Sequence, residues 1–268
     1  MLKTLLRQAR ARIDYLDAVL IMAFVLNRSK ESIMIARDDE SLSPEEAVRF
    51  MDLVSQRASH KPLAYITGNC EFMGLDFEVN GHTLIPRPDT EIVVETALHV
   101  IKQAGIKTIL DICTGSGCIA VSLSVLCPAK LNITASDING EALKTAEKNA
   151  AKHGASISFI QSDMFRRIDP SPYELIIANP PYIPHYEIDA LPCSVRDYEP
   201  RAALDGGPDG LDFYRILAGK AVNYIIFEIG YNQAQDVKNI LEQRGFQDIQ
   251  IIKDLAGRNR VISARKNG

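Results

Sequence analysis

The fold is decided by the stretch Thr108-Ile109-Leu110-Asp111-Ile112-Cys113-Thr114-Gly115-Ser116-Gly117-Cys118-Ile119-Ala120, in which an apolar strand runs into a glycine turn and then a helix. Gly115 and Gly117 allow the backbone to pass close beneath a ligand, and the first amides of the helix favour negative or hydrogen-bonding groups. Asp137 follows twenty residues beyond Gly117, at the end of the next expected strand. A carboxylate at this position can accept both hydroxyls of a ribose. The pattern predicts a cofactor that contains a nucleoside.

The glycine turn leaves the identity of that cofactor open. Gly115-x-Gly117-x-x-Ala120 also satisfies the loose dinucleotide fingerprint, so the turn alone does not separate NAD from S-adenosylmethionine. A third interpretation is a tight turn followed by a solvent-facing Asp137 with no ligand.

Strands and helices alternate from residue 90 onward. Seven strands are expected, at residues 108–112, 132–136, 156–160, 174–178, 224–228, 247–252 and 260–264, with helices near 90–104, 118, 140–152, 211–221 and 232–243. Such alternation predicts an α/β fold with a mostly parallel, doubly wound, Rossmann-like sheet. The last two strands leave no room for a helix between them, so we expect them to pair antiparallel at an edge.

The first 70 residues show a helical pattern instead. A first helix is expected over about sixteen residues, a second over residues 18–26, and a third from Ser43, where Pro44 and Glu46 complete a capping box. Phe77, Val79 and the apolar pair at 84–85 flank Asn80-Gly81, which predicts a β-hairpin. The expected domains are a helical bundle at 1–70, a hairpin linker at 71–89 and the sheet domain at 90–268.

Composition narrows the class of protein. The 268 residues carry a net charge of −4, so the chain lacks the basic balance of a typical nucleic-acid-binding protein. The longest apolar stretch, residues 18–26, is far shorter than the roughly 20 residues of a membrane span. The five cysteines form no C-x-x-C pair and fit a reducing cytoplasm better than a disulfide framework. The basic start, with its helical apolar spacing, is interpreted as an ordinary helix rather than a transit peptide.

No metal site or strong base is expected. The five histidines (His60, His82, His99, His153 and His185) are scattered and lack the spacing of ligand pairs on a helix. Each is interpreted as a surface or hydrogen-bonded histidine.

The tetrapeptide Asn179-Pro180-Pro181-Tyr182 follows the expected strand at 174–178, at the carboxyl edge where doubly wound sheets bind ligands. Two prolines remove two amide donors and stiffen the corner, so its nearby polar groups are mainly acceptors. The Asn179 side-chain oxygen and the Pro180 carbonyl can each accept one N–H of a planar NH2 group, while the Tyr182 ring covers its flat face. The corner therefore predicts methyl transfer from S-adenosylmethionine to an amino or amide nitrogen.

The whole chain resembles the N5-glutamine methyltransferases of the HemK/PrmC type, which modify the Gly-Gly-Gln loop of peptide chain release factors. The matching segments are Pro62 to Gly68, Leu84 to Glu91, the glycine turn, Ser162 to Phe165, Asn179 to Tyr182, Glu199 to Leu204 and Gly210 to Tyr214. Pro86-Arg87-Pro88-Asp89-Thr90-Glu91 discriminates most, because related enzymes that methylate a ribosomal protein carry a different segment there.

The resemblance implies a class I methyltransferase sheet, S-adenosylmethionine as methyl donor, S-adenosylhomocysteine as product and a class 1 release factor as partner. It implies that Cys113, Thr114, Gly115, Ser116 and Gly117 wrap the methionine part of the donor. Asp137 would hold the ribose, Asp163 and Met164 would flank the adenine, and Asn179 to Tyr182 would hold the target amide.

Two positions remain open. Cys113 stands where such turns often have glycine, so we expect its backbone to avoid positive φ, and we expect a direct contact with the donor from its neighbours in the turn rather than from Cys113. Arg87 is expected beside the active site, with a plain helix start as the alternative, in which Pro88 is early in the helix and Asp89 and Glu91 lie in its first turn.

Other functions compete with this interpretation. DNA adenine-N6 methyltransferases use the same corner, because adenine N6 is also a conjugated NH2, but they need a basic surface to hold DNA. A glutamine methyltransferase that acts on a ribosomal protein is the nearer alternative. A donor-binding protein without catalysis, or an NAD oxidoreductase, would leave Asn179 and Tyr182 without a role.

Overall fold

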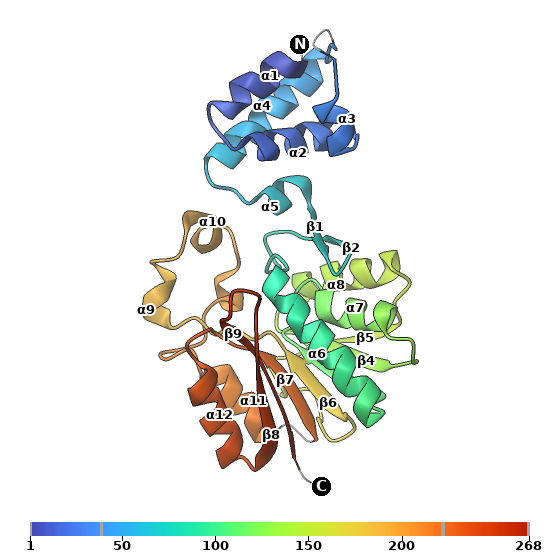
Figure 1. The fold of residues 1–268 in the computed structure, drawn as a ribbon, viewed down its shortest axis with the longest axis vertical. Helices are drawn as coiled ribbons and strands as arrows, with labels where there is room; N and C mark the ends of the chain where they lie inside the picture. Colours follow the sequence, from blue (N-terminus) through green and yellow to red (C-terminus); the bar gives the residue numbers. More distant parts are fainter. Residues whose placement is uncertain (1, 38–39, 221–222, 267–268) are drawn as a thin grey trace. The chain divides into compact units, whose positions relative to one another are not determined.

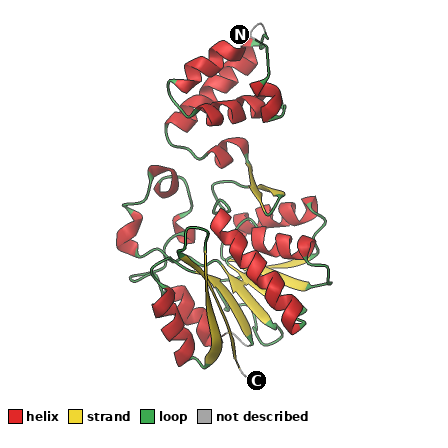
Figure 2. Ribbon diagram, viewed as in Figure 1, coloured by secondary structure: helices red, strands yellow, loops and turns green. Residues whose placement is uncertain are grey.

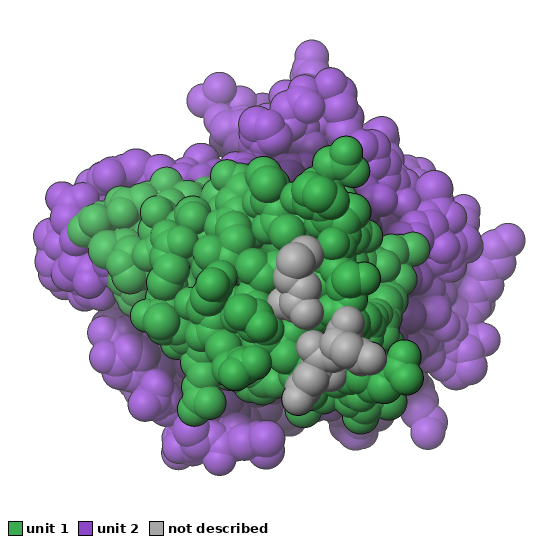
Figure 3. Space-filling model, turned by 90° about the horizontal axis from the view of Figure 1, so that it is seen from above, with its two compact units in different colours: residues 1–69, 192–198 green, residues 70–191, 199–268 purple. Residues whose placement is uncertain are grey.

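The computed structural model describes residues 2–37, 40–220 and 223–266. The chain divides into two compact units (Figure 3): residues 1–69 with 192–198, and residues 70–191 with 199–268. The assignment of residues 192–198 to the helical unit was not expected from the sequence, because it depends on tertiary contacts rather than on local pattern.

The helical unit contains α1 (Leu2–Arg10), α2 (Tyr15–Leu26), α3 (Lys30–Met34), α4 (Pro44–Ala58), α5 (Leu63–Thr67) and α10 (Cys193–Arg196). The capping box of α4 is present: Glu46 N donates to Ser43 Oγ at 3.1 Å, and Ser43 N donates to Glu46 Oε2 at 2.8 Å. The expected first helix is shorter than predicted. It ends at Arg10, because Asp14 accepts the Leu16 amide at 2.8 Å and begins a separate helix.

The hairpin turn lies elsewhere than predicted. Strands β1 (Asn69–Phe72) and β2 (Leu75–Glu78) are joined by Met73 and Gly74, whose φ values of 53° and 71° are those that a two-residue turn of type I′ requires. The hairpin buries Phe72 and Phe77 edge to face, with ring centroids 6.0 Å apart. Asn80 serves a loop instead, where it donates to Thr145 Oγ1 at 2.8 Å.

The seven-stranded doubly wound sheet is confirmed, in the order β5-β4-β3-β6-β7-β9-β8. Its strands are β3 (Thr108–Ile112), β4 (Asn132–Asp137), β5 (Ile157–Gln161), β6 (Leu175–Ala178), β7 (Tyr224–Glu228), β8 (Phe246–Lys253) and β9 (Asn259–Lys266). The first five are parallel. The expected antiparallel pairing of the last two strands is also confirmed, and β9 lies between β7 and β8.

Helices cover both faces of this sheet (Figures 1 and 2). Ile109 of β3 packs in a core with α6 (Pro88–Ala104), α7 (Cys118–Leu126) and α8 (Gly140–Lys152). Its neighbour Leu110 packs in a second core with α11 (Asp212–Lys220) and α12 (Ala234–Gln243). The short α9 (His185–Ile188) and the 3-10 helix η1 (Arg201–Ala203) complete the unit, whereas Ala221, the expected end of α11, lies outside the described residues. The strand order turns at β3, so a ligand crevice is expected at the carboxyl ends of β3, β4 and β6.

Candidate active site

A cavity of about 560 Å³ opens at this carboxyl edge. Most predicted site residues line it: Arg87, Cys113, Thr114, Gly115, Ser116, Asp137, Asp163, Met164, Asn179 and Pro181. The predicted residues Gly117, Pro180 and Tyr182 are near in sequence to these but do not line it. All of the lining residues belong to the unit that contains the sheet.

The two glycines of the turn have different surroundings: there is free space beside Gly115, whereas Gly117 packs tightly against α8. Gly115 has a φ of 56°, and a Cβ built there would meet nothing within 4 Å. Gly117 has a φ of 80°, and a Cβ there would lie 3.0 Å from the Cβ of Ala146 in α8. Gly117 therefore allows close packing of two helices, while Gly115 leaves room for a ligand.

Cys113 corrects the prediction for its backbone. Its φ is 62°, in the left-handed region that we expected it to avoid. The next residue explains this geometry, because Thr114 N donates to Ser136 O at 3.0 Å and ties the turn to the end of β4. A non-glycine residue in this region costs roughly 1–2 kcal/mol. The turn thus keeps the shape that glycine would give, and Cys113 does line the cavity.

Asp111 is a buried carboxylate to which the sequence analysis gave no role. Its Oδ2 accepts the Thr114 hydroxyl at 2.6 Å, and its Oδ1 has no hydrogen-bond partner among the described residues. Burial raises the pKa of Asp111 to about 7. An acidic residue between the buried apolar residues Leu110 and Ile112 was the signal that could have identified it.

Asp137 lies at the end of β4, as predicted, and lines the cavity. Its two carboxylate oxygens accept the backbone amides of Gly115 and Asn139, each at 2.9 Å. Burial raises the pKa of this group, while those two amide bonds oppose the increase. Each oxygen keeps a second lone pair, so the carboxylate can still accept ribose hydroxyls.

The turn after β5 brings Asp163 and Met164 to the cavity wall. Met164 has a φ of 48°, and the Ser162 hydroxyl donates to its carbonyl at 2.8 Å. This local bond fixes the turn, and the Met164 side chain offers an apolar surface. The two residues bring one acceptor and one apolar side chain to the cavity wall, the combination that binding of an adenine would need.

The Asn-Pro-Pro-Tyr corner follows β6 directly. Asn179 Nδ2 donates to Thr90 Oγ1 at 3.2 Å, and the Tyr182 hydroxyl donates to Glu228 Oε1 at 3.2 Å. Pro180 and Pro181 are buried. The sequence analysis placed Thr90 in the discriminating block at 86–91 without giving it a role, and it did not single out Glu228, because nothing local links α6 and β7 to this corner.

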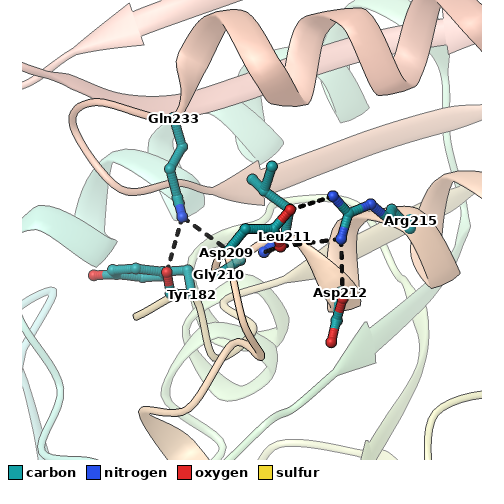
Figure 4. A network of polar contacts seen from close by, with 7 residues as sticks. All are labelled: Tyr182, Asp209, Gly210, Leu211, Asp212, Arg215 and Gln233. Atoms are coloured by element: carbon teal, nitrogen blue, oxygen red, sulfur yellow. Dashed lines mark hydrogen bonds and ion pairs between the residues drawn. The ribbon is translucent and has the colours of Figure 1, made fainter. Parts of the chain in front are cut away.

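A polar network holds the loop at 205–212 against the corner (Figure 4). Gln233 Nε2 donates to the Tyr182 carbonyl at 2.8 Å and to the Gly210 carbonyl at 3.2 Å. Gly206 packs so closely that a Cβ there would lie 2.7 Å from the Cα of Tyr182. The corner is therefore rigid, which suits a site that must orient a planar group.

Arg87 meets both predictions made for its segment. It lines the cavity and forms an ion pair with Glu199, whose side chain is 1% exposed. It is also the residue before α6, where Pro88 occupies the first helical position and Asp89 and Glu91 lie in the first turn.

Two histidines line the cavity, a position that the sequence analysis did not predict, although both are exposed, as expected for surface histidines. They are His82 and His185, and His185 Nδ1 lies 2.5 Å from Asp205 Oδ1. Both follow turn signals, which gave no indication that those loops fold over the site. Within the described residues, no group of three or more His, Cys, Asp or Glu side chains is arranged to hold a metal ion.

Comparison with known proteins assigns the family. Residues 2–68 match the PrmC N-terminal domain, and residues 90–191 match the methyltransferase small domain. Over 261 residues the chain is 38% identical to a release factor glutamine methyltransferase of Clostridium botulinum, covering 94% of this chain and 92% of that protein. The chain belongs to the release factor glutamine methyltransferases. A member of this family from Geobacter sulfurreducens is 42% identical over 233 residues, covering 85% of this chain and 81% of that one.

Solved structures support the fold of this methyltransferase. The hMettl16 catalytic domain matches with a TM-score of 0.58 and 15% identity, covering 92% of this chain and 93% of that one. A methyltransferase from Pyrococcus furiosus matches with a TM-score of 0.54 and 14% identity, covering 80% of this chain and 98% of that one. Among the helices in the described part of the chain, none has the length and apolar character to cross a membrane.

Proposed function

We propose that this protein transfers the methyl group of S-adenosylmethionine to the side-chain amide nitrogen of the glutamine in the Gly-Gly-Gln loop of class 1 peptide chain release factors. S-adenosylhomocysteine is the second product. The observation that carries the proposal is the acceptor-rich corner at Asn179, at the wall of a cavity that also contains the glycine turn and Asp137.

The residues present fit the methyl donor. Thr114, which lines the cavity, donates its hydroxyl to the buried Asp111 at 2.6 Å, so the turn that would wrap the donor is held in place from below. Asp137 retains acceptor capacity for ribose hydroxyls, and Gly115 leaves the turn open. S-adenosylmethionine supplies an electrophilic methyl group on a sulfonium.

The corner supplies orientation rather than acid–base chemistry. Asn179 Oδ1 and the Pro180 carbonyl accept the two N–H groups of the target amide and stabilise positive charge as it develops on nitrogen. Correct placement of the reacting atoms lowers the barrier by at most roughly 7–11 kcal/mol. An alkylated amide loses its proton readily, so the mechanism needs no positioned base.

The partner is a protein rather than DNA. A net charge of −4 does not favour binding to a phosphate backbone, and the family model matched by residues 2–68 belongs to PrmC proteins. We assign the helical unit to docking of the release factor, because a specific interface needs about 800 Å² per partner. The reaction takes place in the cytoplasm, where release factors act, and involves neither metal nor membrane.

Methylation of a purified release factor with labelled S-adenosylmethionine, followed by mass spectrometry, tests the proposal. The label is expected on the glutamine of the Gly-Gly-Gln loop. A ribosomal protein and an adenine-containing DNA duplex serve as competing substrates, and preferential labelling of either would replace the assignment. A short Gly-Gly-Gln peptide should react with a much higher KM than the folded factor if the helical unit docks the partner.

Asn179→Ala tests the chemistry. Loss of one such electrostatic partner typically lowers turnover about 10²- to 10³-fold. Tyr182→Phe should stay within about tenfold if the ring matters more than the hydroxyl. Asn259→Ala, which does not line the cavity, is the matched control. Single-turnover rates at saturating donor, on variants with unchanged melting temperature, give the comparison, and a near wild-type rate for Asn179→Ala would contradict the mechanism.

A further inference from the structure

A chain of hydrogen bonds runs behind the Asn-Pro-Pro-Tyr corner. Asn179 Nδ2 donates to Thr90 Oγ1 at 3.2 Å, and Thr90 Oγ1 donates to Glu228 Oε2 at 2.5 Å. The other oxygen of Glu228 accepts the Tyr182 hydroxyl at 3.2 Å. Three elements supply these groups: the end of β6, the first turn of α6 and the end of β7.

The position of each proton follows from the chemistry of the groups. An ionised Glu228 can only accept, so the single hydroxyl proton of Thr90 must point toward it. The Thr90 oxygen can then only accept from Asn179, which must present its NH2 group. The Asn179 carbonyl oxygen is thereby turned away from Thr90. It has no hydrogen-bond partner among the described residues.

Thr90 and Glu228 are both buried, so the hydrogen bonds between Asn179, Thr90 and Glu228 are shielded from bulk water. Thr90 and Glu228 are each 2% exposed. Thr90 lines the cavity, whereas Glu228 lies behind it and does not. Burial of a carboxylate is costly unless its oxygens are hydrogen-bonded, and both oxygens of Glu228 are. A core glutamate that stabilises only packing could be replaced by an apolar residue without that cost.

Burial favours protonation of Glu228, whereas the hydrogen-bond donors and the cation beside it favour the ionised form, which can only accept. Its pKa is raised by burial and by Asp89, and this rise is opposed by the hydrogen bonds from Thr90 and Tyr182 and by the charge of Arg260. Arg260 itself is paired with Asp89 at 3.0 Å and Asp254 at 3.2 Å. One cation and two hydroxyl donors therefore surround the carboxylate.

We propose that Thr90 and Glu228 are positioning residues, which fix the orientation of the Asn179 amide so that its oxygen faces the NH2 group of the target glutamine. The proposal rests on the proposed function. It names the residues that make the site selective for a target amide, whose NH2 group donates hydrogen bonds to the corner. With the Asn179 amide reversed, two NH2 groups would face each other, and the target nitrogen would lose an acceptor. Glu228 also holds the Tyr182 ring through its second oxygen.

We call the hydrogen bonds from Asn179 to Thr90 and from Thr90 to Glu228 the relay. Glu228→Gln reverses the direction of donation along it. The glutamine oxygen can still accept from Tyr182, but its NH2 group then donates to Thr90, whose proton turns toward Asn179. Asn179 is forced to present its oxygen to Thr90 and its NH2 to the substrate. We expect a single-turnover rate about 10²-fold below that of the wild type, as for loss of one oriented acceptor.

Asn179→Asp restores an acceptor in that reversed relay. In the double variant Asn179→Asp/Glu228→Gln, the carboxylate at 179 accepts from Thr90 with one oxygen and from the target amide with the other. In the single variant Asn179→Asp, Thr90 has already given its proton to Glu228, so two acceptors oppose each other. We expect the double variant to react at least tenfold faster than Asn179→Asp alone. If Glu228 had only a structural role, the double variant would react more slowly than Asn179→Asp alone, because the effects of two unfavourable substitutions in one core would add.

Thr90 provides the second arm of the test. Thr90→Val removes the hydroxyl at nearly constant shape and should lower the rate to a similar extent, whereas Thr90→Ser should retain most of it. Glu228→Gln should have little further effect in the Thr90→Val background, because the relay is already broken. Thr108→Val is the matched control: Thr108 likewise donates to a glutamate, Glu174 Oε2 at 3.0 Å, but at the start of β3 and outside the cavity, so turnover should be unchanged.

Rates are measured on the full chain with a release factor at saturating donor, together with donor affinity and melting temperature. The proposal is overturned if Glu228→Gln reacts at the wild-type rate, if the Thr90 and Glu228 effects multiply independently, or if the double variant is slower than Asn179→Asp. Nuclear magnetic resonance of ¹⁵N-asparagine-labelled protein tests the relay without activity. The Asn179 NH2 protons should show a nuclear Overhauser effect to the Thr90 methyl group, which Glu228→Gln removes. An inactive wild type that shows this contact would refute the proposed function alone, and absence of the contact would refute the relay.

Discussion

Replacing Asp111 with asparagine should stabilise this protein by an amount that grows with pH. The carboxylate is fully buried in β3, and burial raises its pKa from 3.8 to about 7. Each pKa unit corresponds to 1.36 kcal/mol, so the ionised form lowers the stability of the folded state by up to roughly 4 kcal/mol above pH 7. Asparagine resembles the protonated acid in shape and carries no charge.

The direction of the pH dependence follows from the number of protons that the folded and unfolded states bind. Between about pH 4 and pH 7 the folded protein holds a proton on Asp111 that the unfolded chain has lost. The contribution of this residue to the free energy of unfolding therefore decreases as pH rises through that window and is constant above it. The difference between Asp111→Asn and the wild type should be near zero at pH 4, rise through neutrality and level off near pH 8.

Urea unfolding followed by far-ultraviolet circular dichroism measures this difference, since the chain has no tryptophan. Asp169→Asn is the control, because hydrogen bonds from Ser171 lower the pKa of Asp169 below 3.8. The stability difference between that variant and the wild type changes only below about pH 4, so it should be constant through the window in which Asp111 titrates. An Asp111→Asn variant with the same stability difference at every pH, or with lower stability than the wild type at pH 8, would refute the reasoning.

Three further outcomes are expected at the glycine turn and its partner strand. Asp137→Ala should weaken binding of S-adenosylmethionine by roughly 1.5–3 kcal/mol in calorimetry, the range for hydrogen bonds to a charged group, with no gain in NAD binding. Cys113→Gly should raise the melting temperature or leave it unchanged, because it relieves a φ of 62°, and a marked decrease would contradict the strain. Gly117→Ala should destabilise by about 1–3 kcal/mol in urea unfolding, since its Cβ would lie 3.0 Å from that of Ala146 at a φ of 80°.

The parts of the fold that follow local rules could be predicted from the sequence. The capping box at Ser43, the seven strands and the antiparallel last pair each combine a consistent local pattern with a consistent tertiary role. The predicted position of the hairpin turn was wrong, because two turn sequences, Met73-Gly74 and Asn80-Gly81, lie within ten residues of each other. Packing of Phe72 against Phe77 favours the turn at Met73 and Gly74, and the sequence pattern of either turn alone does not contain that information.

The candidate site divides in the same way. Residues that belong to recognisable motifs, such as Asp137 after the glycine turn and Asn179 in the Asn-Pro-Pro-Tyr corner, were predicted at the carboxyl edge of the sheet and do line one cavity. Thr90 and Glu228 lie 89 and 49 positions from Asn179. Although Thr90 stands in the discriminating block at 86–91, no local pattern pairs either residue with that corner. Their role depends on which strands become neighbours, and β6 and β7 become neighbours only in the folded sheet.

The residues that break local rules gather at the carboxyl edge of the sheet. Cys113 holds a left-handed backbone, Asp111 has a buried oxygen without a hydrogen-bond partner in the described part of the chain, and Glu228 buries a carboxylate behind the corner. Each is unfavourable in an isolated strand or turn, and each contacts or precedes a residue that lines the cavity. Local conflict of this kind persists where the surrounding structure stabilises it, and functional sites are where such conflicts are expected. The acidic residue in an apolar strand and the cysteine in a glycine turn are therefore sequence signals of this site, since a chain optimised for stability alone would carry neither.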